Sequence, residues 1–174
     1  MLVVFNCQVR SQDIYVTRNA TLTFAGIYNE DPVKGMSEDL TVRLDYERAI
    51  ITVEFLLSSV KSEKKTLNEI LSKSRTRILM TGYFNIEYIS TEDHSPMEFA
   101  VEGYLEYDNI KMSIEGTGEL HHIGDGNSAD YACMLGLRFG IDLKNLGMSY
   151  EDLEGIDNHI EVIMTQALLR RDKR

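Results

Sequence analysis

Residues 116–127, with the sequence GTGELHHIGDGN, combine glycines, two adjacent histidines and an aspartate, which are residue types of phosphate loops, metal sites and turns. A phosphate loop is followed by a helix whose free amides face the anion, but an alternating, strand-like segment follows here. The third glycine of a dinucleotide fingerprint is also missing after Gly116 and Gly118. Gly124–Asn127 therefore predicts a hairpin loop, because its residue types tolerate positive φ angles. We place Gly116 and Gly118 inside the preceding strand, where glycine marks a bulge or a sharp bend.

The ligand atoms of His121, His122 and Asp125 raise the question of a metal site. Adjacent histidines in an extended chain point to opposite faces, so at most one of them can share a site with Asp125. Further ligands would have to come from elsewhere, and the nearest candidate, His94, lies in a segment that reads as an exposed loop. The pattern favours solvated loop residues over a metal centre.

Signatures of catalysis are weak in this chain. It contains no Gly-x-Ser-x-Gly elbow and no cysteine in a setting that predicts activation. Many carboxylates alternate with the apolar positions and are expected on the outer, solvated face: Glu54, Glu87, Glu98, Glu102, Glu106 and Glu115. A catalytic carboxylate pair stays an open alternative, but no pair stands out. We therefore expect no enzyme, and we assign no catalytic residue, metal or cofactor.

Length and charge restrict the class of protein and its partners. The 174 residues, 43% of them hydrophobic, suit a single domain over residues 1–174 with a sizeable core. The net charge of −10 repels phosphate backbones and anionic lipid headgroups, so we expect no nucleic-acid partner. The basic residues between Arg170 and Arg174 read as a solvated tail.

The N-terminal segment MLVVFNCQVR has no lysine or arginine before a short apolar run. It predicts neither a signal peptide nor a membrane span, and we expect a cytoplasmic protein unless a leader was removed. Cys7 and Cys133 lie far apart and make no disulfide framework, so we expect buried thiols.

Apolar and polar residues alternate with a period of two over most of the chain, which predicts half-buried strands. The clearest alternating segments are 21–26, 40–46, 49–57, 77–89, 96–107, 109–120, 131–141 and 159–169. Together with the N-terminal segment they make eight or nine strands. We therefore predict an all-β fold, an antiparallel barrel of about eight strands that can hold side chains or one small ligand.

Two segments depart from the strand pattern. In Ser62–Ser74, the residues Leu67, Ile70 and Leu71 have helical spacing, which predicts an amphipathic helix that rests on the barrel or closes its mouth. Ser149–Gly155 has a capping-box-like start and a glycine stop, which predicts a short helical turn before the last strand.

The inward-facing positions either fill a core or line an elongated apolar cavity, and periodicity does not separate the two. In the second case the candidate ligand-binding residues are Phe24, Leu44, Phe55, Met80, Phe84, Met97, Phe99, Met112, Ile114, Tyr131, Leu135 and Phe139. The flexible thioethers of its methionines suit a flexible hydrocarbon tail. Tyr83, Tyr104 or Tyr131 could supply a polar contact to the head of such a ligand.

Three longer stretches resemble the YceI-like family of lipocalin-like barrels. AIITVEFLLSSVKSEKKTLNEIL, at 49–71, is similar to a family strand that ends in a Ser-x-x-Ser stretch and a helical excursion. FAVEGYLEYDNIKMSIEGTGEL, at 99–120, resembles a strand pair, and 137–143 with 155–169 resemble the closing pair. The resemblance implies binding of a polyisoprenoid or another long-chain lipid, without turnover, because the family has no single catalytic constellation to carry over.

Three functional hypotheses follow. The first is a carrier that encloses an apolar long-chain molecule, with the helix near an opening. The second is a solid barrel that recruits a protein partner through its strand edges and the Leu67, Ile70 and Leu71 stripe, including a homodimer. The third and weakest is a metal-assisted hydrolase that uses His121 or His122 with Asp125.

Overall fold

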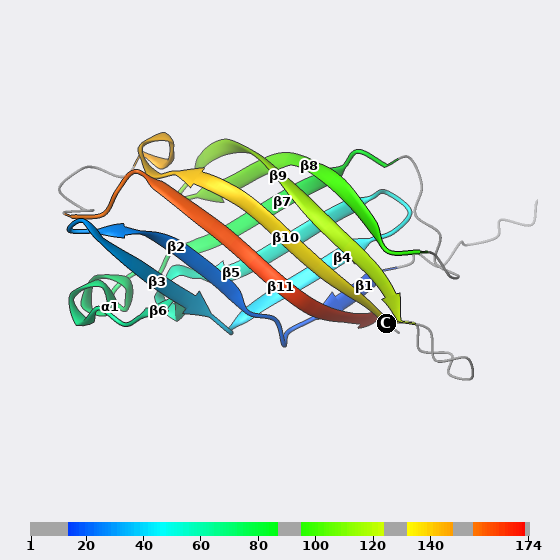
Figure 1. The fold of residues 1–174 in the computed structure, drawn as a ribbon, viewed down its shortest axis with the longest axis horizontal. Coiled ribbons are helices and arrows are strands. Elements are labelled where there is room, and N and C mark those ends of the chain that lie inside the picture. The colour runs from blue at the N-terminus through cyan, green and yellow to red at the C-terminus, as the bar shows by residue number, and fades with distance from the viewer. Residues whose placement is uncertain (1–13, 87–94, 124–131, 148–154, 173–174) are drawn as a thin grey trace, which may run out of the picture.

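The computed structural model describes residues 14–86, 95–123, 132–147 and 155–172, which contain a closed antiparallel β-barrel (Figure 1). In order around its wall, the eight strands are β1 (Ile14–Thr17), β4 (Leu40–Asp45), β5 (Ile50–Leu56), β7 (Arg77–Phe84), β8 (Met97–Tyr107), β9 (Ile110–Ile123), β10 (Ala132–Asp142) and β11 (His159–Arg171). Pairing of β1 with β11 closes the barrel. The predicted all-β barrel of about eight strands is confirmed.

Three further strands extend the wall at one end: β2 (Leu22–Tyr28), β3 (Asp31–Ser37) and β6 (Lys61–Ser62). The long strand β11 pairs with β1 near Arg171 and with β2 near its own start. β3 then pairs with β2 and with β6. One end of the barrel is thus closed by β1 and β4, and the other is extended by β2, β3 and β6.

Short helices lie at this extended end. α1 spans Lys65–Leu71, and the 3-10 turns η1 and η2 span Leu57–Ser59 and Leu143–Leu146. The helix predicted over Ser62–Ser74 is present but shorter, because Ser62 still belongs to β6. Most of the turn predicted at Ser149–Gly155 lies outside the described residues. Within the described part of the chain, the helices are too short to cross a membrane.

Two hairpins have the tight two-residue turn that matches the twist of antiparallel strands. Asn29 and Glu30 join β2 to β3 with φ angles of 49° and 68°. Asp108 and Asn109 join β8 to β9 with φ angles of 45° and 67°. Two successive positive φ angles are the mark of a type I′ turn. This geometry fixes the β2–β3 hairpin that forms part of the candidate site.

The prediction that Gly116 and Gly118 lie inside a strand is confirmed, but the bulge that it offered as one alternative is wrong. Both glycines lie within β9, whose pairing with β8 and β10 continues without a shift through them. A Cβ at Gly118 would overlap the ring of Phe99, so this glycine makes room for an aromatic side chain. The shift in register lies in the β10–β11 pairing, between Leu135 and Leu137.

Candidate functional site

An apolar cavity of about 410 Å³ lies at the extended end of the barrel. Side chains from β2, β3, β5, β7, β8, β10 and β11 form its wall, and η1, α1 and η2 contribute to its rim. Figure 1 shows α1 and η2 at the same end of the molecule. The size falls within the range of small-molecule sites, which are concave and mostly apolar.

α1 covers part of this cavity with the predicted apolar stripe. Leu67, Ile70 and Leu71 all line the cavity. Leu67 is buried and Leu71 is half-buried, whereas Ile70 keeps 51% of its surface exposed. An apolar residue that both lines a cavity and reaches solvent lies at its opening. Ile70 therefore marks the mouth.

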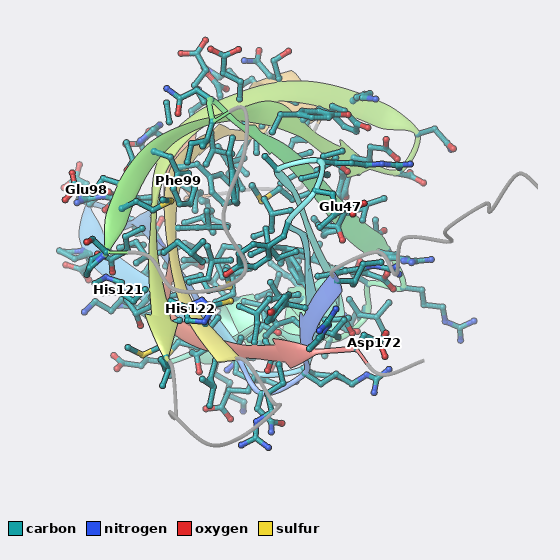
Figure 2. All side chains as sticks on the ribbon, turned by 90° about the vertical axis from the view of Figure 1, so that its right-hand side faces the viewer. Glu47, Glu98, Phe99, His121, His122 and Asp172 are labelled. Carbon is teal, nitrogen blue, oxygen red and sulfur yellow. The ribbon has the colours of Figure 1, made fainter. Side chains whose placement is uncertain are left out.

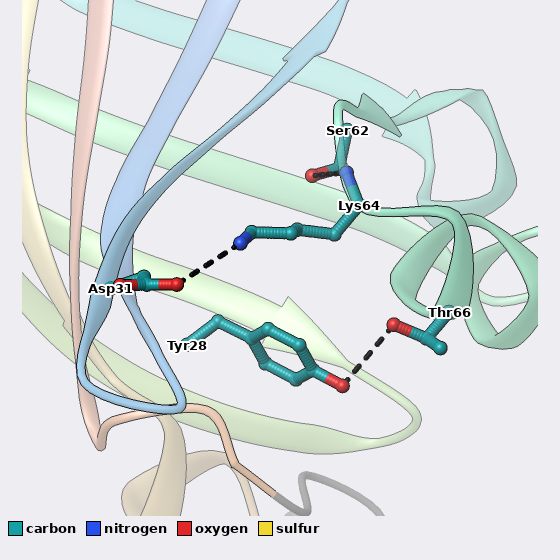
Figure 3. Close-up of polar contacts among 5 residues, drawn as sticks. All are labelled: Tyr28, Asp31, Ser62, Lys64 and Thr66. Atoms are coloured by element: carbon teal, nitrogen blue, oxygen red, sulfur yellow. Dashed lines mark hydrogen bonds and ion pairs between the residues drawn. The ribbon is translucent and has the colours of Figure 1, made fainter.

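Side-chain contacts fasten α1 to the β2–β3 hairpin (Figure 3). Lys64 Nζ lies 3.3 Å from Asp31 Oδ2, and the Tyr28 hydroxyl lies 3.2 Å from Thr66 Oγ1. Both contacts are exposed and join segments more than thirty residues apart in the chain. The hairpin and the helix therefore meet through a small number of polar atoms at the rim.

Asn68 anchors α1 to β6 from the other side. The amide N–H of Ser62 donates to Asn68 Oδ1, and Asn68 Nδ2 donates to the Ser62 carbonyl, both at 2.7 Å. Nearby, the hydroxyl groups of Ser37 and Ser59 lie 2.6 Å apart and join the end of β3 to η1. These bonds hold β3, β6 and α1 as one connected rim.

η2 closes the rim opposite α1. Its backbone is held by Lys144 N–H, which donates to the side chains of Asp142 and Asn158 at 3.1 and 2.9 Å. Gly147 ends the turn with a φ of 70°, as a left-handed cap requires. The turn thereby presents Leu143 and Leu146 to the cavity.

The predicted ligand-binding residues divide between the cavity lining and the packed remainder of the interior. Phe24, Phe55, Met80 and Phe139 line the cavity, and the rings of Phe24 and Phe55 lie 5.6 Å apart. The others within the described residues do not line it and pack in the remaining interior: Leu44, Phe84, Met97, Phe99, Met112, Ile114 and Leu135. Tyr131 lies outside the described residues.

Several lining residues were absent from the sequence-based candidates, among them Leu22, Val33, Val53, Leu57, Val60, Leu105, Ile141 and Val162. Alternation identifies which side chains face inward, but it carries no information on their height along the barrel. The apolar stripe of α1 was the one sequence feature that indicated the position of the cavity, because its residues Leu67, Ile70 and Leu71 line that cavity.

Tyr83 and Tyr104 lie on the outer wall. They occupy paired strands with their ring centroids 6.4 Å apart, and Tyr83 is 45% exposed. Lys111 Nζ lies 3.0 Å from the centroid of the Tyr104 ring. These two tyrosines do not line the cavity and so are not in place to hold a ligand head there.

The opposite end of the barrel is filled. Tyr15 and Tyr46 are fully buried there with ring centroids 4.6 Å apart. Burial raises the pKa of the neighbouring Cys133 thiol to about 11, and the Tyr46 hydroxyl partly offsets this shift. Burial also raises the pKa of Tyr46 far above its ordinary value. The Cys133 thiol and the Tyr46 hydroxyl therefore stay neutral in the folded protein near pH 7.

The two histidines occupy opposite faces of β9, as their adjacency predicts (Figure 2). His121 lies on the outer face with its Nε2 atom 3.6 Å from Glu119 Oε2. His122 points inward, and its ring nitrogens are buried. Asp125 and His94 lie outside the described residues. Among the residues that are described, no three His, Cys, Asp or Glu side chains gather as metal ligands.

Comparison with solved structures identifies the fold. A polyisoprenoid-binding domain from Saccharophagus degradans, implicated in plant cell wall breakdown, matches with a TM-score of 0.67 at 11% identity, over 92% of this chain and 99% of that chain. The fold is that of a YceI-like barrel. BcnA from Burkholderia cenocepacia matches with a TM-score of 0.55 at 11% identity, over 87% of this chain and 96% of its own.

No family model and no curated protein matches the sequence. The likeness to solved structures therefore concerns the fold alone. A concave, mostly apolar volume that opens to solvent beside Ile70 suits a hydrocarbon chain whose head stays at the mouth.

Proposed function

We propose that the protein binds and carries an apolar long-chain molecule of the lipid or isoprenoid type inside its YceI-like barrel. The observation that carries this proposal is the cavity of about 410 Å³ beneath α1, with its mostly apolar lining. A similar fold in a polyisoprenoid-binding domain supports the same class of ligand.

Transfer of the ligand chain out of water supplies the binding free energy. Each buried methylene contributes about 0.8 kcal/mol, so a chain that fills the cavity binds without any strong polar contact. The thioether of Met80 and the rings of Phe24 and Phe55 adapt to or cover such a chain. The polar end of the ligand stays outside, near the exposed side of Ile70.

The lining also supports binding without turnover. Of the described residues that line the cavity, Lys34 alone carries a charge, and its side chain is exposed. The lining supplies no carboxylate, imidazole or thiol that could act as a general acid, base or nucleophile. The cavity is therefore suited to holding a molecule and not to reacting with it.

A pair of adjacent substitutions tests the proposal. Val53 is buried and lines the cavity, whereas Thr52 lies on the opposite face of β5. Val53→Phe places an additional ring in the cavity and is expected to weaken binding of 1-hexadecanol at least tenfold. Thr52→Phe adds the same ring type outside and is expected to leave the affinity unchanged. Equal effects of the two variants, or no binding by the wild type, would contradict the proposal.

A wholly filled barrel, as the second hypothesis requires, is disfavoured by the cavity at the extended end. Self-association into a homodimer stays a prediction. Sedimentation with and without 1-hexadecanol would show whether two copies associate and whether the ligand affects their association.

A further inference from the structure

The cavity occupies one half of the barrel interior only. Where β5, β7, β10 and β11 cross the extended end, their inward residues line it, as Phe55, Ile78 and Ile160 do. Inward residues of the same strands toward the closed end, such as Ile51 and Leu135, do not line it although they share the same face. The barrel wall therefore extends beyond the cavity, toward the closed end.

Buried side chains of the described residues pack the closed half. Tyr15, Tyr46, Ile51, Leu120 and Leu135 are buried to within 1% of complete burial. Figure 2, which faces this end of the barrel, shows the interior crossed by side chains. We call these five residues the plug.

Gly82 and Met80 mark the boundary between the plug and the cavity. A Cβ at Gly82 would lie 2.6 Å from Val101 Cγ1 and 3.0 Å from Ile51 Cγ2, so this layer has no space for one methyl group. The same Cβ would lie 3.2 Å from Met80 Cε. Because Met80 lines the cavity and its terminal methyl reaches the closed layer, Met80 forms part of the cavity floor.

The volume above this floor sets the size of the chain. An engineered protein cavity of about 150 Å³ holds one benzene, which has six carbon atoms. At the same density, about 410 Å³ accommodates about 16 carbon atoms. This corresponds to a saturated chain of about sixteen carbons or to an isoprenoid of three five-carbon units.

We infer that this protein selects chains of about sixteen carbons, and that Met80 and the plug set the limit. The inference rests on the proposed function and specifies its ligand class. Carbons beyond the limit remain outside the mouth in water and add no burial. A longer polyisoprenoid therefore gains nothing over a three-unit chain.

The experiment is a chain-length series of primary alcohols from eight to twenty carbons, with geraniol, farnesol and geranylgeraniol. The affinity of each alcohol is measured by displacement of an apolar fluorophore, at alcohol concentrations below those at which the alcohol aggregates. Affinity is expected to rise up to about fourfold per methylene until about sixteen carbons and then to stay constant. Among the isoprenoids, farnesol and geranylgeraniol are expected to bind equally well.

Two variants move the limit in opposite directions. Met80→Ala lowers the floor and shifts the break about two to three carbons higher, whereas Val53→Phe fills the cavity and shifts the break about four carbons lower. Met36→Ala makes the same change at a half-exposed methionine that does not line the cavity, and it leaves the break unchanged. Far-UV circular dichroism and thermal melting confirm that each variant is folded.

The possible results distinguish failure of the length limit from failure of the proposed function. Affinity that still rises from sixteen to twenty carbons overturns the length limit and keeps the proposed function. A break that neither Met80→Ala nor Val53→Phe moves overturns the assignment of the floor. Failure of every alcohol and isoprenoid to bind removes the proposed function, and the length limit with it.

Discussion

The hydroxyl of Tyr28, at the end of β2, lies 3.2 Å from Thr66 Oγ1 on α1. This contact, together with the Lys64–Asp31 ion pair, joins a hairpin and a helix that both line the same cavity. Exposed contacts of this kind contribute little to stability. Because they lie at the rim, a molecule that enters or leaves the cavity passes beside them.

The rim contacts are therefore expected to affect exchange more than stability. The double variant Tyr28→Phe/Lys64→Ala should lower the free energy of unfolding by less than about 1 kcal/mol. It should increase the rate of 1-hexadecanol release severalfold in stopped-flow displacement. Lys65→Ala on the same helix, which breaks only the exposed pair with Glu69, is the control and should leave the release rate unchanged. Equal release rates in the double variant and the wild type would show that the rim does not control exchange.

The backbone of the β2–β3 turn is strained at Glu30, and a substitution can relieve this strain. Glu30 has a φ of 68°, a conformation that costs an L-residue other than glycine about 1 kcal/mol. Glu30→Gly relieves this cost, although the more flexible unfolded chain offsets part of the gain. We expect a net stabilisation of about 0.5 kcal/mol in urea denaturation. Glu38→Gly, an exposed site without a positive φ, should destabilise instead.

Gly118 is expected to tolerate no side chain. A Cβ there overlaps the Phe99 ring, which itself packs against Phe84 with ring centroids 4.0 Å apart. Gly118→Ala should therefore destabilise the barrel by about 1–3 kcal/mol. The additional change Phe99→Leu should recover part of this loss, measured as a non-additive free energy in a double-mutant cycle. Simple additivity of the two changes would exclude the overlap as the cause.

The buried thiol predicts a loss of stability at high pH. Cys133 has a pKa of about 11 in the folded protein, against an ordinary value of 9. The unfolded chain therefore loses this proton first, so the free energy of unfolding is independent of Cys133 below pH 9 and falls between pH 9 and 11. The full loss is about 3 kcal/mol. Burial of Tyr46, whose pKa is also raised, acts in the same direction above pH 10.

Urea denaturation at pH 8 and pH 10.5 measures this dependence. Cys133→Ala should show a smaller decrease between the two pH values than the wild type. In a Cys7→Ser background, the thiol of Cys133 should also react with iodoacetamide at pH 8 far more slowly in the folded than in the unfolded protein. Rapid labelling of the folded protein would contradict the burial and the raised pKa.

Much of the barrel could be predicted because alternation is a local property. Met80 and Phe84 face inward and Tyr83 faces outward, as a period of two requires. The spacing of Leu67, Ile70 and Leu71 likewise indicated the helix that covers the cavity. The same pattern assigned His121 and His122 to opposite faces.

Features that depend on three-dimensional packing were not predictable from this pattern. Phe55 and Leu44 both face inward, but only Phe55 lines the cavity. Leu44 pairs with Ile51 across β4 and β5, so it lies at the level of the plug, where buried side chains occupy the interior. Gly118 looked like a bulge because sequence alone does not show that Phe99 lies across the strand pair.

The most direct test of the central claim is an NMR measurement of farnesol bound to protein labelled with ¹³C at its methionine methyl groups. An interior binding site predicts nuclear Overhauser contacts between the farnesol chain and the Met80 methyl, which forms part of the cavity floor. It predicts none to the methyl of Met36, which is half exposed and does not line the cavity. Contacts to Met36 without contacts to Met80, or no contacts at saturating farnesol, would contradict an interior binding site.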